Sequence, residues 1–107
     1  MTTLPHFDIW VDASTSNGTT LLVPHVVAAT NANLVSETTL TTLNAAGTSN
    51  VTQRRDMRLV AARDETLGSV RTNATQPGQC VLRVRLLDGD VTLASLAYDC
   101  MTGQTIR

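Results

Sequence analysis

The chain has 107 residues, the size of one domain, and a formal net charge of −1 at pH 7. Its eight basic and nine acidic side chains nearly cancel, which excludes the basic surplus that binding to nucleic acid requires. Apolar residues make up 42% of the sequence, enough for one hydrophobic core, yet they form no run that would span a membrane. We therefore predict a single domain over residues 1–107, with no nucleic-acid partner and no membrane span.

The residue types indicate a β-protein from an exporting pathway. Aromatic residues make up only 3% of the chain, so the core must be built from Val, Leu, Ile and Ala. Threonine is abundant and favours strands, and all eight basic residues are arginine. Residues 1–5 lack the basic and apolar segments of a signal peptide. We therefore expect a mature export product that begins at an added methionine.

The first part of the chain reads as short strands separated by polar turns. The strands are predicted over residues 7–12, 20–30, 34–43, 51–54 and 57–62. The breaks between them are predicted at 14–18, 31–33, 45–50 and 55–56. Pro24 lies inside the second strand and removes a backbone donor, so we expect an edge position or a bulge there.

The second part begins with a charged turn at Arg63–Glu65, followed by a strand over 66–74 in which Gly68 predicts a bulge. After a turn at 76–78 comes the strongest pattern, two apolar runs over 80–87 and 91–100 joined by Asp-Gly-Asp, which predicts a hairpin. About seven short antiparallel strands at ten-residue spacing predict an all-β, immunoglobulin-like sandwich. A small barrel is the alternative. Because the only tryptophan lies on the first strand, an antibody-type domain is not expected.

The two cysteines, Cys80 and Cys100, lie near the two ends of this hairpin. Cys80, Leu82, Val84 and Leu86 share one face of their strand, which we predict to face the core. With a three-residue loop Cys80 lies opposite Tyr98, and Cys100 is then a diagonal neighbour, too distant for a disulfide. We predict a disulfide accompanied by a bulge or a register shift, and hence an oxidising compartment. The alternative is a pair of reduced thiols in a cytosolic domain.

We expect no enzymatic activity, no cofactor and no metal. Neither His6 nor His25 has a nucleophile at a known motif spacing. The Asp64–Glu65 pair is more typical of a solvated turn than of a catalytic pair. Asp88 and Asp90 flank a turn glycine and supply too few oxygen ligands for a calcium loop.

One segment resembles a known family. The residues that carry the resemblance are Ala46-Gly-Thr-Ser-Asn50, Gln53, Leu59, Ala61, Arg63, Asp64, Glu65 and Leu67. Together they resemble the alphaproteobacterial, CsgH-like branch of the periplasmic curli-assembly inhibitors related to CsgC. The resemblance implies an immunoglobulin-like sandwich that keeps a curli-type amyloid subunit from polymerising prematurely in the periplasm. The Cys-x-Cys of the CsgC branch is absent from this sequence, so no thiol-redox role is carried over.

An inhibitor of this kind offers its client either a sheet edge or weak electrostatic contacts. Arg83 and Arg85 are two residues apart and therefore share one face of a strand, opposite Leu82 and Val84. Arginines can fork onto carboxylate or amide groups of a client. We predict that a monomer binds its client through Arg83 and Arg85, aided by the nearby Arg54, Arg55 and Arg58. The alternative is that these arginines form an ordinary solvated sheet face, with cross-strand pairs to Asp or Thr and no binding role. The alternative function is a structural or adhesive module of an exported surface assembly.

Overall fold

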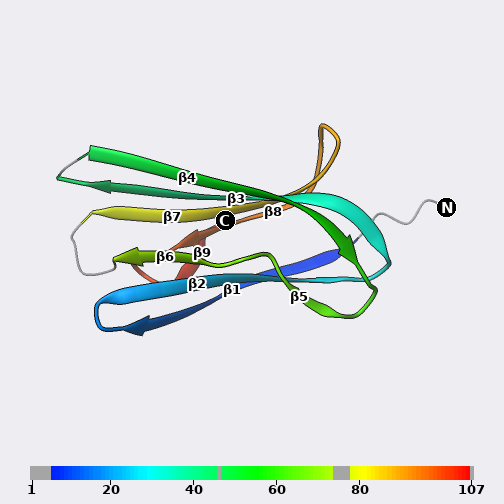
Figure 1. The fold of residues 1–107 in the computed structure, drawn as a ribbon, viewed down its shortest axis with the longest axis horizontal. Coiled ribbons are helices and arrows are strands. Elements are labelled where there is room, and N and C mark those ends of the chain that lie inside the picture. Colours follow the sequence, from blue (N-terminus) through cyan, green and yellow to red (C-terminus); the bar gives the residue numbers. More distant parts are fainter. Residues whose placement is uncertain (1–5, 46, 74–77, 107) are drawn as a thin grey trace.

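The computed structural model describes residues 6–45, 47–73 and 78–106. In these residues the chain forms strands and turns with no helix (Figure 1). The nine strands are β1 (Phe7–Ser16), β2 (Thr19–Ala28), β3 (Ala32–Asn44), β4 (Gly47–Leu59), β5 (Asp64–Thr66), β6 (Val70–Asn73), β7 (Gln79–Asp88), β8 (Val91–Asp99) and β9 (Gln104–Ile106).

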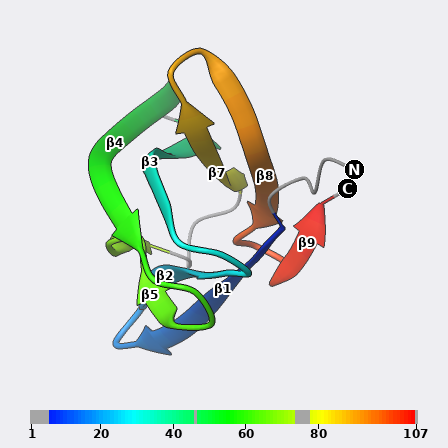
Figure 2. The same cartoon turned by 90° about the vertical axis from the view of Figure 1, so that its right-hand side faces the viewer.

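The strands form two antiparallel sheets that lie as separate layers (Figures 1 and 2). In the first sheet β2 pairs with β1 on one side and with both β5 and β6 on the other. The second sheet has the order β4-β3-β7-β8-β9. The β2–β6, β3–β7 and β7–β8 pairs correspond to the B–E, C–F and F–G pairs of an immunoglobulin sandwich. The predicted fold class is confirmed, and the barrel alternative is wrong.

The core lies between the sheets and is made almost entirely of aliphatic side chains. In β2 buried and half-buried residues alternate over the whole strand, and β7 shows the same period of two as far as Leu86. The largest fully buried core side chains include Leu22, Leu59, Leu67, Leu82 and Leu86. Burial of each leucine contributes roughly 1.5–3 kcal/mol, so the sandwich does not need an aromatic core.

The prediction of two strands over 51–54 and 57–62, with a break at Arg55–Asp56, is wrong. β4 runs without interruption from Gly47 to Leu59 because β3 offers a partner for each of its residues in one unbroken register. Of the predicted break at 45–50, Ala45 lies in a turn and Gly47–Asn50 form the start of β4, while Ala46 lies outside the described residues. Pairing with a long neighbour thus extends a strand through charged residues of low strand propensity.

The region after β4 also differs from its prediction. The expected charged turn at Arg63–Glu65 contributes Asp64 and Glu65 to β5, which pairs with Val26 and Val27 of β2. The expected strand over 66–74 is divided, since the chain leaves the ladder at Leu67–Ser69 and returns as β6. β9 was not predicted at all. The remaining part of the predicted 66–74 strand, Ala74, lies outside the described residues, as do residues 76–77 of the predicted 76–78 turn.

Pro24 is placed in the centre of the first sheet, not at its edge. Its carbonyl accepts a hydrogen bond from the Leu67 amide at 2.9 Å. In an antiparallel strand the N and C=O of one residue point to the same side, so the ring nitrogen faces the gap between β5 and β6. The missing donor therefore coincides with the interruption between β5 and β6, and the structure shows neither the expected edge position nor a bulge in the β1–β2 register.

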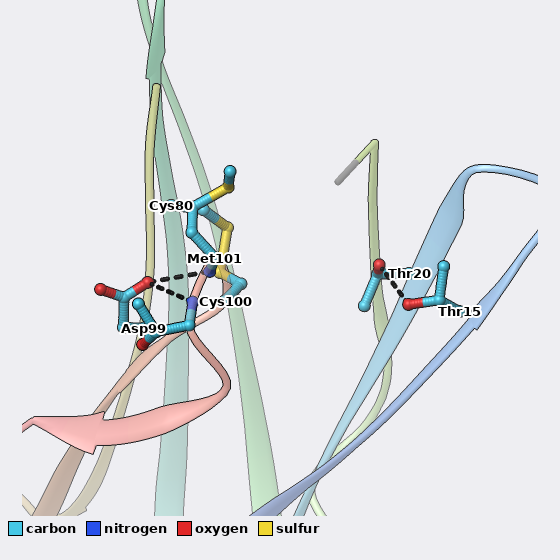
Figure 3. The surroundings of a disulfide bond; sticks show 7 residues. Thr15, Thr20, Cys80, Asp99, Cys100 and Met101 are labelled. Atoms are coloured by element: carbon cyan, nitrogen blue, oxygen red, sulfur yellow. Dashed lines mark hydrogen bonds between the residues drawn. A yellow bond between two sulfur atoms is a disulfide. The ribbon is translucent and has the colours of Figure 1, made fainter. Parts of the chain in front are cut away.

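The β7–β8 hairpin contains the predicted disulfide, between Cys80 and Cys100 at a Cα–Cα distance of 5.2 Å (Figure 3). Its loop is tighter than the three residues assumed, because Asp88 pairs with Val91. A bulge at Leu86/Leu87 then shifts the register, so that Leu82 lies opposite Tyr98. This shift puts Cys100 beside Cys80, and the amide of Cys100 donates to the carbonyl of Cys80 at 3.0 Å. The bulge required by the prediction is confirmed.

Candidate functional site

The candidate site is the outward face of the second sheet. Leu82 and Val84 of β7 are fully buried, whereas Arg83 and Arg85 are exposed on the opposite side, as predicted. In the ladder, Glu37 of β3 lies between Arg54 of β4 and Arg85 of β7. The neighbouring row places Arg83 beside Thr39. Three strands, β4, β3 and β7, therefore bring charges that are distant in sequence onto one face.

Glu37 is the centre of a charged cluster. Both Nε and Nη2 of Arg85 approach its Oε1, at 3.1 and 3.0 Å, and Nε of Arg54 lies 3.8 Å from its Oε2. The Glu37 side chain is 19% exposed, against 48% for Arg85 and 60% for Arg54. One carboxylate thus serves two guanidinium groups, and the cluster keeps an excess of positive charge toward solvent.

Arg83 differs from Arg85 because it forms no ion pair with any residue that the structure describes. Its cross-strand neighbours are Thr39 and Ala97, which are uncharged. Beside it lies an open hollow of about 520 Å³. The hollow is lined by Arg83, Val84, Arg85, Ser95, Leu96, Ala97, Thr105 and Ile106. An exposed guanidinium next to small and aliphatic side chains suits a segment with both acidic and apolar groups.

The other predicted arginines are not all on this face. Arg58 lies opposite Asn33 and shares the outward side with Arg54, but four residues along β4, or about 13 Å, separate them. Arg55 points to the opposite side of β4. Its Nη1 would lie 3.6 Å from a Cβ placed on Gly68, so it faces the other sheet across the open edge of the sandwich. Arg55 does not belong to the Arg83–Arg85 surface.

Two contributors were missed by sequence reasoning. Glu37 is the only acidic residue between Asp12 and Asp56 and stands alone in a threonine-rich strand, which was the available signal. β9, which supplies Thr105 and Ile106 to the hollow, has only three residues. Its position depends on a turn in which the Asp99 carboxylate accepts hydrogen bonds from the amides of Met101 and Thr102, at 2.8 and 3.2 Å (Figure 3).

A second polar cluster lies on the first sheet. His25 of β2 places Nε2 2.9 Å from Oδ2 of Asp12 on β1, and Nδ1 2.9 Å from Oδ1 of Asp64 on β5. The Trp10 ring stacks on the imidazole with a centroid distance of 5.2 Å and an interplanar angle of 3°. The ring thereby joins three adjacent strands. This arrangement is a cross-strand clamp, in which the imidazole is held on both nitrogens and on one face.

No group of three or more His, Cys, Asp or Glu side chains suited to a metal ion occurs in residues 6–45, 47–73 and 78–106. Within the same ranges no helix is long and apolar enough to cross a membrane. The disulfide is consistent with an extracytoplasmic location, since such bonds persist in oxidising compartments.

The fold and the charged face define a small, two-layered β-sandwich with a surface suited to binding an acidic partner. No family model matches the sequence, and no curated protein matches it. Among solved structures the chain is similar to CsgH of R. palustris, with 22% identity, a TM-score of 0.71, and coverage of 92% of this chain and 97% of that one.

It is also similar to the curli protein CsgC of E. coli, with 15% identity, a TM-score of 0.73, and coverage of 89% of this chain and 98% of that one. The chain therefore has a CsgH/CsgC-like fold, in agreement with the resemblance read from the sequence. A sandwich of this shape also forms 15% of a B. fragilis protein described as a β-galactosidase, at 14% identity and a TM-score of 0.57. The shape alone does not define a function.

Proposed function

We propose that this protein is a non-enzymatic, chaperone-like inhibitor that acts in the periplasm as a monomer. In this proposal it keeps a curli-type amyloid subunit from polymerising prematurely by weak, transient binding. The likeness of the whole chain to CsgH and to the curli protein CsgC supports the class of client. The proposal of this binding surface rests on the exposed Arg83–Arg85 pair, which lies on a central strand beside an open hollow.

The physical chemistry of this face suits weak binding. Exposed ion pairs contribute roughly 0–1 kcal/mol each and are screened over about 10 Å at 0.1 M salt. A few such contacts hold an unfolded client briefly without a deep pocket. Because Glu37 already neutralises part of Arg85, Arg83 offers the freer guanidinium. We therefore expect Arg83 to contribute more to client binding than Arg85.

The test is thioflavin-T kinetics of a curli-type subunit with the protein at low molar ratio. Wild type should lengthen the lag phase, and the effect should fall as ionic strength rises. The double variant Arg83→Ser/Arg85→Ser should lengthen the lag phase less than wild type. Its thermal stability should change by no more than about 1 kcal/mol, since only exposed charges are removed. Arg83→Ser alone should weaken inhibition more than Arg85→Ser alone.

Arg63→Ser/Arg71→Ser is the matched control, because it removes two exposed arginines from outside the second sheet. This variant should inhibit as well as wild type. If the Arg83/Arg85 variant inhibits equally well at low salt, the arginine face is not the binding surface. If wild type has no effect at any ratio, the inhibitor proposal fails. Assembly of the purified protein into multimers during size-exclusion chromatography would then favour a structural or adhesive module.

A further inference from the structure

The sheet edges of this molecule differ in how well they are protected against pairing with another strand. Exposed edges present unpaired N–H and C=O groups, and proteins usually protect them with charges, prolines, bulges or short strands. β5, β6 and β9 have only three or four residues each. β1 carries the exposed carboxylates of Asp8 and Asp12. The part of β8 beyond β9 contains the bulge.

The first half of β4 has none of these protections. Residues Gly47–Gln53 contain no charged residue and no proline, and the β3–β4 register is unbroken along them. All residues from Gly47 to Asp56 are exposed. β4 is the last strand of its sheet, so alternate residues direct their N–H and C=O groups away from β3 into solvent. Such an uncharged strand edge is an unused template for strand addition.

Positive charge begins where this uncharged stretch ends. Arg54 follows Gln53 and belongs to the Glu37 cluster, while Arg55 faces the other side of the strand. β4 as a whole carries three arginines and one aspartate, a net charge of +2. A second copy of the chain would bring the same excess charge to the edge. An extended segment that carries carboxylates would meet opposite charges instead.

We propose that the Gly47–Gln53 edge of β4 binds an extended, acidic segment of the client by β-strand addition. This inference rests on the proposed function and names the edge that the client uses. Backbone hydrogen bonds to β4 supply the contact. Arg54, which follows this edge segment, lies in one cross-strand row with Glu37 of β3 and Arg85 of β7, so the edge adjoins the arginine face. A client strand held here is aligned with the sandwich, and one of its own edges is covered, so it is delayed from pairing with another subunit.

The test uses proline variants on the two long edge strands. Val51→Pro and Thr52→Pro are both prepared, because only one of two successive residues directs its N–H away from β3. The variant that retains the wild-type melting temperature is the one that alters the free edge. In the thioflavin-T assay this variant should need about fivefold more protein for the same lag time, equivalent to about 1 kcal/mol.

The matched control is the tolerated member of the pair Ala13→Pro and Ser14→Pro on the β1 edge, which should inhibit like wild type. A second measurement needs no substitution. With the curli-type subunit present, hydrogen exchange should slow at the amides of residues 47–53 that do not pair with β3. Wild-type inhibition that survives in the tolerated β4 variant, with no slowing of exchange, would overturn the edge inference but leave the arginine face standing. A wild-type dimer that the same variant abolishes would assign the edge to a second copy and also overturn it.

Discussion

Loss of the Cys80–Cys100 bridge should destabilise the sandwich substantially. The bridge joins residues 20 positions apart. Closing a loop of that size removes about 11 cal/mol/K of entropy from the unfolded chain, or about 3.3 kcal/mol at 25 °C. Unfolding entropy near 60 °C is about 2.1 cal/mol/K per residue, so the whole chain gains about 0.22 kcal/mol/K. The loss of about 3.3 kcal/mol divided by this unfolding entropy gives an expected fall in melting temperature of about 15 °C.

The assay is thermal unfolding of the native protein, of the protein after reduction, and of the Cys80→Ala/Cys100→Ala variant. Reduction removes the cross-link without changing the packed volume around the buried Cys80. The variant should melt as low as the reduced protein or slightly lower, and reductant should not affect it further. Alkylation of the native protein should label no thiol. A fall of less than about 5 °C on reduction would refute the loop-closure reasoning.

Two further substitutions test the packing of the sheets. The Thr38 hydroxyl is buried without a hydrogen-bond partner among the described residues. Thr38→Val should therefore stabilise the fold by about 1 kcal/mol, raising the melting temperature by about 4 °C; a lower melting temperature would contradict this. His25→Ala removes the hydrogen bond to Asp64, the close contact with Asp12 and the Trp10 stack, and should cost about 2 kcal/mol in urea unfolding. The control His6→Ala affects only an exposed pair with Asp8 and should stay within about 0.5 kcal/mol of wild type.

Strand pattern and hairpin chemistry were readable from the sequence because they depend on neighbours along the chain. The alternation of β7 placed Leu82 and Val84 inside and Arg83 and Arg85 outside, and the structure agrees. Asp-Gly between two apolar runs located the β7–β8 hairpin. A disulfide between Cys80 and Cys100 required a bulge or a register shift in this hairpin, and the bulge is present.

The errors lie where distant segments decide the local conformation. Arg55 and Asp56 favour a break, yet β3 holds them in a continuous strand. Asp64 lies in a charged segment that is typical of a turn, yet it pairs with β2 and contacts His25. In both cases hydrogen bonds to a neighbouring strand outweigh propensities that span only about 1 kcal/mol.

By itself, then, the sequence determined the class of fold and the inward and outward faces of its best-patterned strands, and it predicted the disulfide that the structure contains. Only the tertiary structure decided which arginines share a surface, because that depends on the register between strands distant in sequence. Glu37 and Arg85, for example, are 48 residues apart. A register change of one residue would reverse the faces of every side chain in a strand. The uncharged residues of β4 can be read from the sequence. That β4 is a free edge follows from the strand order of the sheet, which depends on contacts between distant segments and not on any local sequence pattern.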